Sequence, residues 1–199
     1  MKTLGIVPIV EGHGEQESIR ILLTRTVGEL LGAPYPLVLP PIRQPRSKLV
    51  NKPRELERAV ELGALKLRQS SSSFEHGFVL VLIDADEDRP CELAPRLLMR
   101  ARRADVDVAC VLANPEYETW FVAAAPSLSR YLLLDEAAVE DPETQGLKKA
   151  WIERRYARGS YSETIDQPRL TAAMDLTMCR AGSRSYDKLC RELERRLSA

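Results

Sequence analysis

Acidic side chains follow two apolar runs of this sequence, and they are of the type that binds divalent cations. The runs are LGIVPIV at residues 4–10 and FVLVLI at residues 78–83. The acids that follow them are Glu11, Glu15, Asp84, Asp86 and Asp88. Carboxylates gathered at one place repel each other, and their pKa values rise unless a cation compensates them. Hard oxygen donors without histidine or thiolate favour Mg²⁺ or Mn²⁺.

Each of these acids also has an ordinary structural interpretation. Asp84 and Asp86, taken alone, are typical of residues that cap a following helix, and Asp88 suits the same role. The DADED segment begins like a calcium-binding loop. That interpretation fails because Arg89 stands at the loop's sixth position and Pro95 at its twelfth, where glycine and glutamate are needed.

The elements that position the acids alternate between strands and helices. Four apolar runs predict strands, at residues 4–10, 35–42, 78–83 and 106–112. A helical pattern follows each of them, and such alternation predicts an α/β fold with a parallel sheet between helices. Pro8 predicts an irregular point or bulge in the first strand, because proline cannot donate to a ladder. Ligands of such sheets collect beyond the carboxyl ends of the strands, where the acids lie.

The strand signal ends after Pro126. Helical patterns then cover residues 127–134, 143–157, 168–180 and 185–197. We therefore expect an α/β domain over residues 1–125 and a helical extension or lid, packed on it, over residues 126–199.

Three motifs in order resemble the Toprim domain, the metal-dependent catalytic domain of topoisomerases, bacterial primases, recombination-repair proteins and the overcoming-lysogenization-defect nucleases. VEGHGEQE at residues 10–17 is especially similar to the nuclease branch, and Asp-x-Asp at residues 84–86 resembles the metal-ligand motif. NPEYETWF at residues 114–121 is similar to a signature of small stand-alone Toprim-like proteins. The resemblance covers residues 4–125 and leaves the later helices without a counterpart.

This resemblance implies a Toprim/Rossmann-like fold and a Mg²⁺-dependent nuclease or related phosphoryl-transfer activity on nucleic acid. By carry-over, Glu11 is the general acid/base or metal-binding glutamate, and Glu15 is an additional ligand. Asp84 and Asp86 match the metal ligands, and Glu118 matches the glutamate of the third motif. Some of the similar stand-alone proteins are encoded beside ABC-type ATPases in phage-defence loci, so the resemblance also implies an ATPase partner.

The third motif has a structural interpretation too. Tyr117, Trp120 and Phe121 occur at helical spacing and are typical of core residues. In a regular helix Glu118 would point about 200° away from Trp120, that is, outward. The family match therefore requires Glu118 to stand before the helix proper, and Glu116 remains the second choice. His13, between the two glycines of EGHGE, is expected to be exposed to solvent.

The total charge predicts no partner, because 29 basic residues balance 29 acidic ones. A stretch without acids nevertheless carries five basic residues: Arg43, Arg46, Lys48, Lys52 and Arg54. Nearby prolines predict an extended segment that suits phosphate contacts, although a solvated loop explains it equally well. A second basic group, from Lys148 to Arg158, has the spacing of an exposed surface helix.

Composition excludes several classes of protein. No apolar run is long enough to cross a membrane, and the first residues lack a signal-peptide pattern. The four cysteines form no CxxC pair, which predicts reduced thiols in a cytoplasmic protein. Two rival functions stay open: a non-catalytic Toprim-fold module that binds a partner or regulates it, and a metal-dependent phosphatase of small molecules.

Overall fold

The computed structural model describes residues 3–103, 105–134, 141–144 and 148–198. Its centre is a parallel sheet with the order β2-β1-β4-β5, in which β3 also pairs with β1. The strands are β1 (Leu4–Val10), β2 (Leu37–Val38), β3 (Ile42–Arg43), β4 (His76–Asp84) and β5 (Asp107–Ala113). The parallel α/β architecture predicted from the sequence is confirmed.

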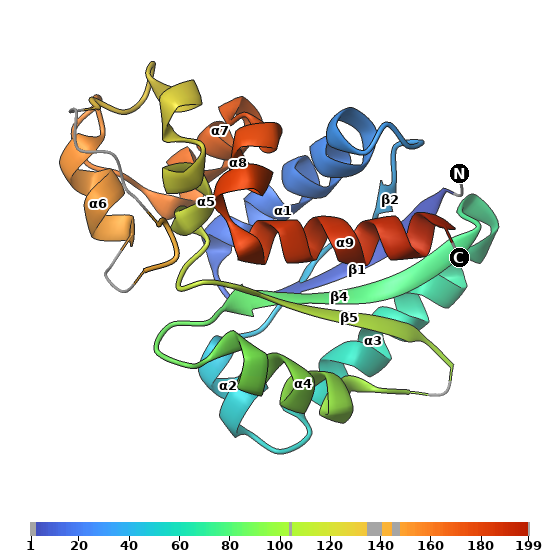
Figure 1. The fold of residues 1–199 in the computed structure, drawn as a ribbon. Helices are drawn as coiled ribbons and strands as arrows, with labels where there is room; N and C mark the ends of the chain where they lie inside the picture. The colour runs from blue at the N-terminus through green and yellow to red at the C-terminus, as the bar shows by residue number, and fades with distance from the viewer. Residues whose placement is uncertain (1–2, 104, 135–140, 145–147, 199) are drawn as a thin grey trace.

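Helices cover both faces of this sheet (Figure 1). One face carries α1 (His13–Arg25), its π-helical continuation η1 (Thr26–Leu30), α7 (Glu163–Ala173), α8 (Leu176–Gly182) and α9 (Arg184–Ser198). The other face carries α2 (Arg46–Asn51), α3 (Glu55–Gln69), the short turn η2 (Ser71–Ser73) and α4 (Pro90–Ala101). Because both faces are buried, the central strands β1, β4 and β5 are apolar in near-continuous runs instead of alternating, and the polar residues of β4 and β5 stand at the strand ends. In β1, for example, Ile6 packs in one core cluster and Val7 in the other.

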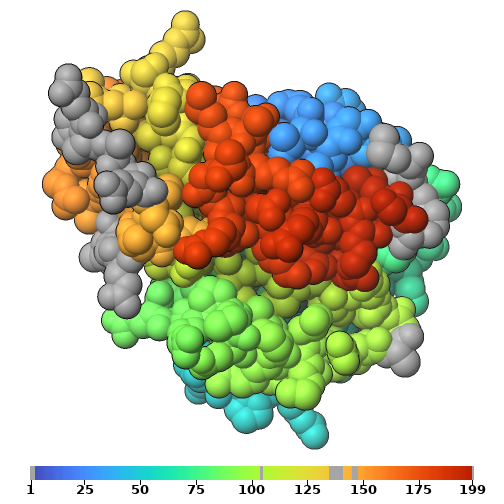
Figure 2. Space-filling view, viewed as in Figure 1, coloured from blue at the N-terminus to red at the C-terminus, as the bar shows by residue number. Residues whose placement is uncertain are grey.

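Three further elements lie past the carboxyl ends of the strands: α5 (Glu118–Ala123), η3 (Ala125–Leu128) and α6 (Lys148–Arg155) (Figure 1). In the space-filling view the C-terminal helix forms a strip across the front, between the η1 surface and α4 (Figure 2). No helix in the described ranges has the length and apolar character needed to cross a membrane.

Pro8 does not interrupt β1, contrary to the sequence prediction. The strand is continuous, and Pro8 lies opposite Leu80 of β4. The carbonyl oxygens of Ile6 and Val10 accept hydrogen bonds from the segment that contains β2 and β3. Backbone groups two residues apart in a strand face the same neighbour, so an N–H at position 8 would point toward β2 and β3 as the Ile6 and Val10 carbonyls do. It faces the gap between β2 and β3, where no ladder hydrogen bond is required.

The prolines of residues 35–42 split the predicted second strand into the two short strands β2 and β3 at the sheet edge. The basic stretch that follows is not extended as predicted, because residues 46–51 form α2. Pro45 precedes the helix, and Leu49 buries its side chain against the α3 side of the sheet. One and a half turns with a single buried residue leave too weak a periodic signal to recognise in the sequence.

The C-terminal helices differ in detail from the sequence prediction. The segment predicted as a helix at 127–134 forms only the 3₁₀ turn η3 before an isolated bridge between Leu132 and Tyr156. The predicted helix at 168–180 is two helices, because Asp175 caps α8 by accepting the Met178 N–H at 2.8 Å. Of the predicted helix at 143–157, α6 covers residues 148–155, and residues 145–147 lie outside the described residues.

Candidate active site

Acids from three strand ends meet at the carboxyl edge of the sheet. Glu11 follows β1, and its Oε1 accepts the backbone N–H of Asp84, at the end of β4, at 2.6 Å. Asp84 in turn accepts, through Oδ1, the backbone N–H of Tyr117 at 2.8 Å. Tyr117 directly precedes α5, so one line of hydrogen bonds joins the end of β1 to the end of β4 and to the segment after β5. Local strand geometry therefore fixes both carboxylates.

Glu15 enters the same region from the first turn of α1. It is buried, and Gln167 of α7 approaches it with 3.5 Å between Gln167 Nε2 and Glu15 Oε1. Gln167 is held by the Ser18 hydroxyl, which donates to its Oε1 at 3.2 Å. Both glycines of EGHGE leave room for these side chains: a Cβ at Gly12 would displace the Glu15 carboxylate, and one at Gly14 would displace the Gln167 side-chain oxygen.

Glu118 is the first residue of α5 and is buried, with 4% of its surface exposed. The hydroxyl of Tyr161 donates to its Oε1 at 2.8 Å. The prediction that Glu118 must precede the helix was wrong, as was the expectation that a helical position would turn it outward. Trp120 is buried as well, because α6, α7 and α8 pack around the short α5 and leave it no solvent face.

Asp86 and Asp88 are exposed at the rim, where Arg46 of α2 pairs with both. Arg46 Nε lies 3.2 Å from Asp86 Oδ2, and Nη2 lies 2.5 Å from Asp88 Oδ2. The same guanidinium donates to the carbonyl oxygens of Asp84 and Ala85 at 2.9 and 2.8 Å. Arg46, which the sequence suggests for nucleic acid, thus holds the turn after β4. Asp86 has a left-handed backbone, with φ of 51°.

The clustered acids hold more negative charge than the surrounding protein neutralises. Burial raises the pKa of Glu11 to about 7, and the nearby charges of Glu15 and Asp86 add to this. Burial likewise raises the pKa of Glu118 to about 7 and the pKa of Glu15 above its usual range. The pKa of Asp84 lies well above its ordinary value, through burial first and then the charges of Glu11 and Glu118. Such an uncompensated group is where a cation would bind favourably.

The donors suit a hard divalent cation, since all are carboxylate oxygens. Within the described ranges, however, no group of three or more His, Cys, Asp or Glu side chains is placed as a ready metal site. Mg²⁺ demands near-ideal octahedral geometry. Binding would therefore require Glu11, Asp84 or Asp86 to turn toward a common point, and Asp86 to leave Arg46.

A family model described as "Domain of unknown function (DUF4276)" matches residues 10–194. The chain belongs to this family. No curated protein and no solved structure matches the chain. The DUF4276 region runs from the end of β1 to α9, so it contains both acidic motifs together with the helices that cover them. The family description names no activity, and the resemblance to Toprim remains a prediction.

Within the DUF4276 region, four polar residues of the C-terminal third join the site: Lys149, Tyr161, Glu163 and Gln167. Of these the sequence marked only Lys149, as part of the basic group from Lys148 to Arg158. Lys149 Nζ lies 2.7 Å from Glu163 Oε1. The charge of Glu163 helps to raise the pKa of Glu15 and Glu118, although burial is the larger cause in both. Local periodicity cannot reveal such contacts, which join residues far apart in the chain.

The remaining predicted residues lie outside the carboxylate group. Arg43, Lys48, Lys52 and Arg54 are exposed on and around α2. His13 is exposed, as expected. Glu116, the alternative to Glu118, points toward α6, where its Oε2 accepts the backbone N–H of Lys149 at 3.0 Å. Of the two glutamates, Glu118 is the one whose charge is among the main causes that raise the pKa of Asp84.

Proposed function

We propose that this DUF4276 protein is a divalent-metal-dependent nuclease that hydrolyses phosphodiester bonds in nucleic acid. The observation that carries the proposal is the meeting of Glu11, Asp84 and Glu118 at one sheet edge. Glu11 and Asp84 lie at the ends of two strands and Glu118 at the start of α5, and these acids are partly or fully buried with fewer nearby cations, Arg46 and Lys149, than carboxylates. An arrangement that serves stability alone would pair each buried carboxylate with a basic group.

Glu11, Glu15, Asp84 and Asp86 are the residues that would hold Mg²⁺ or Mn²⁺. Such ions supply charge stabilisation for the attacking and leaving oxygens of a phosphodiester. No serine, cysteine or histidine nucleophile is needed in this chemistry, which agrees with the absence of a buried histidine beside the carboxylates in the described chain.

The chain's own groups have distinct roles in this proposal. The backbone N–H groups of Asp84 and Tyr117 fix the carboxylates of Glu11 and Asp84. The Tyr161 hydroxyl fixes the Glu118 carboxylate, and the α1–α7 packing excludes bulk water from Glu15. A proton can be held on Glu118 near neutral pH, because burial raises its pKa to about 7. A group with that pKa is suited to transfer a proton at neutral pH.

The exposed basic residues beside the site would contact the phosphate backbone. Lys48 and Lys52 of the α2 region are candidates, since both are exposed. Participation in phage defence with an ABC-type ATPase partner belongs to the same proposal and is supported only by the Toprim resemblance.

A second candidate function is a non-catalytic module that binds or regulates a partner. One observation favours it: Arg46 occupies Asp86 and Asp88, two of the five predicted metal ligands. A bound guanidinium there neutralises part of the charge that a metal ion would otherwise neutralise. In that case the acids would have a structural role around Arg46, and no divalent cation would bind.

Cleavage assays with matched variants test the proposal. Purified protein is incubated with plasmid, single-stranded DNA and RNA in Mg²⁺, Mn²⁺ or EDTA. We expect cleavage with a divalent ion and a loss on the order of 100-fold or more in Asp84→Asn, the size typical when a group that stabilises transition-state charge is removed. Asparagine keeps an acceptor for the Tyr117 N–H, so the fold should persist. Asp105→Asn, an exposed acid paired with Arg68, is the control.

Absence of cleavage of every substrate, together with no Mg²⁺ or Mn²⁺ binding by calorimetry, would refute the nuclease proposal and leave the partner-binding module. Cleavage that persists in Asp84→Asn would show that the activity does not come from this site.

A further inference from the structure

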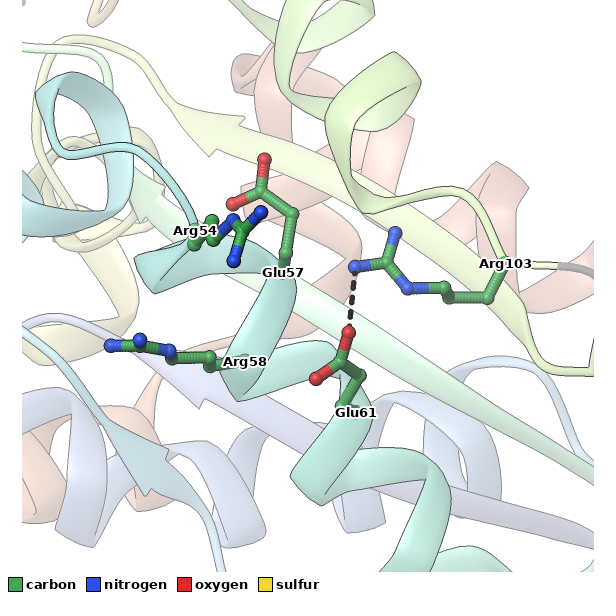
Figure 3. A pocket seen from close by; sticks show the side chains of 5 residues that line it. All are labelled: Arg54, Glu57, Arg58, Glu61 and Arg103. Atoms are coloured by element: carbon green, nitrogen blue, oxygen red, sulfur yellow. Dashed lines mark hydrogen bonds and ion pairs between the residues drawn. The ribbon is translucent and has the colours of Figure 1, made fainter.

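A groove of about 260 Å³ lies on the opposite face of the sheet from α9, beside α3. It is lined by Arg54, Glu57, Arg58, Glu61 and Arg103. Figure 3 shows Arg54 and Arg58 leaving the start of α3, while Arg103 reaches across from the segment after α4. Three guanidinium groups from two segments about 45 residues apart therefore line one concave surface. Planar guanidinium forks match the geometry of phosphate.

The carboxylates of the groove do not cancel this charge. Glu57 is already paired with Arg100 of α4, whose Nε lies 3.1 Å from Glu57 Oε1. Arg100 also donates to the carbonyl oxygens of Val50 and Lys52, at 2.8 and 3.2 Å, and so fixes the end of α2 against α4. Arg100 thus supports the groove from behind Glu57 and takes up most of that carboxylate's charge, although Glu57 still interacts with Arg103.

Arg54 and Arg58 are available to a ligand, and Arg103 becomes so where it exchanges Glu61 for a phosphate. The Arg54 side chain is exposed and has no ion-pair partner in the described part of the chain, and its backbone is left-handed, with φ of 65°. Arg58 is 70% exposed and reaches only Glu55, one turn before it, at 3.3 Å. Arg103 is 26% exposed: its Nη1 donates to the carbonyl oxygens of Arg100 and Arg102 at 3.2 and 2.9 Å, and its Nη2 lies 3.1 Å from Glu61, a carboxylate that is 60% exposed. Exposed pairs of this kind contribute about 0–1 kcal/mol, so a phosphate can replace the carboxylate at little cost.

The groove is connected to the acidic edge by α2. Arg46 at the start of α2 contacts the turn after β4, and Arg54 lies just beyond its end. A helix of six residues spans about 9 Å, roughly three phosphate repeats of one strand of a duplex. Lys48 and Lys52, both exposed, lie on this route.

We propose that the groove formed by Arg54, Arg58 and Arg103 binds backbone phosphates of nucleic acid, several nucleotides away from the carboxylates. This inference rests on the proposed function for its ligand, since it makes the groove a second site of attachment that holds the flank of a substrate. Phosphate contacts of this kind position a nucleic acid without reading its sequence.

Binding measurements in EDTA test the groove separately from cleavage. A labelled single-stranded 30-mer and a duplex of the same length are titrated by fluorescence anisotropy at several salt concentrations. The triple variant Arg54→Gln/Arg58→Gln/Arg103→Gln is compared with wild type and with Arg68→Gln. The side chain of Arg68 also extends from α3, is 54% exposed and pairs with Asp105 outside the groove, so Arg68 is a matched control.

We expect the triple variant to bind 10-fold or more weakly, with a salt dependence whose slope falls by about 2 to 3, because each arginine that is replaced leaves one phosphate without its cation. Arg68→Gln should match wild type. Thermal melting checks that the variant is folded, and the single variant Arg58→Gln, an exposed site, should give a smaller loss if the triple variant does not fold. Inorganic phosphate and ATP, titrated by calorimetry, distinguish a site for free anions from one for a polymer.

The inference is overturned if wild type does not bind either oligonucleotide, if the folded groove variants bind like Arg68→Gln, or if phosphate or ATP binds the groove while the oligonucleotides do not. These outcomes are separable from those of the nuclease proposal. Wild type that binds through the groove without cleaving under any metal refutes the nuclease and keeps the groove. If wild type cleaves and the triple variant binds and cleaves equally well, the groove is refuted and the nuclease proposal is kept.

Discussion

Two groups of charged side chains lie at opposite edges of the sheet and are balanced in opposite ways. At the carboxyl edge, Glu11, Asp84 and Glu118 all have raised pKa values, with burial as the largest cause. At the amino edge, Arg196 of α9 binds Asp107 and Glu192. Arg196 Nη2 donates to Asp107 Oδ1 at 2.9 Å, and its Nη1 donates to Glu192 Oε2 at 2.6 Å.

In the amino-edge group, the acids with a structural role are paired with a buried arginine. Arg196 is 1% exposed, and its guanidinium also stacks over Phe78, 4.5 Å from the ring centre. Burial alone would raise the pKa of Glu192, but Lys188 and Arg196 lower it to about 2. Arg196 likewise lowers the pKa of Asp107 against the effect of burial. The same chain pairs the acids of the amino edge closely with cations, whereas the acids of the carboxyl edge keep raised pKa values despite Arg46 and Lys149, and this contrast supports the binding site proposed there.

Removing the cation of the balanced group should have the largest effect. Arg196→Met leaves Asp107 and Glu192 without their shared partner, and we expect the free energy of unfolding at pH 7 to fall by about 3 kcal/mol. Arg195→Met, at a neighbouring position that is 62% exposed, should change it by less than about 0.5 kcal/mol. Urea unfolding followed by circular dichroism measures both. Equal stability of the two variants would contradict the structural role of the amino-edge group.

Supplying a cation to the unbalanced group should stabilise the protein. At pH 8, Mg²⁺ at 100 times its dissociation constant should raise the free energy of unfolding by about 2.7 kcal/mol, because it binds the folded state. The gain should disappear in Asp84→Asn and shrink at pH 5, where protons occupy the carboxylates. Thermal melting with Mg²⁺ or EDTA measures it. Identical melting curves in both would argue against a metal site.

The two groups should also give opposite pH slopes. The pKa of Glu118 is raised to about 7, so the unfolded chain loses its proton first, and stability falls as pH rises from about 4.5 through 7. The pKa of Glu192 is lowered to about 2, so its contribution is complete above about 4.5 and is lost as pH falls toward 2. Without metal, the free energy of unfolding should fall by about 1–2 kcal/mol less between pH 5 and 8 in Glu118→Gln than in wild type. An unchanged slope in this variant would contradict the raised pKa.

A smaller effect is expected where the C-terminal helices touch the acids. Tyr161→Phe removes the hydroxyl that donates to Glu118, which should cost about 1 kcal/mol and raise the pKa of Glu118 further. NMR titration of the side-chain carboxyl carbon measures the pKa directly. Tyr35→Phe, at a tyrosine that is 65% exposed, is the control. A pKa that does not move would mean that Tyr161 has no influence on the site.

The sequence predicted the parts of this site that depend on local pattern. Continuous apolar runs marked β1 and β4, and the acids directly after them fell where parallel strands end together. The orientation of Glu118 could not be predicted in the same way, because it depends on the helices packed around α5. Tyr161 and Gln167 were missed for the same reason: Gln167 is 152 positions from Glu15, and nothing in their local sequences relates them.

That long separation in sequence affects when the site can form during synthesis of the chain. The pocket around Glu15 and Glu118 is closed by Gln167 and Tyr161, which are synthesised 152 residues after Glu15 and 43 residues after Glu118, respectively. Until then the carboxylates stay hydrated and free to separate, and the apolar faces of α1 and α5 are uncovered. The proposed site is therefore complete only after the segment that carries Tyr161 and Gln167 has been synthesised.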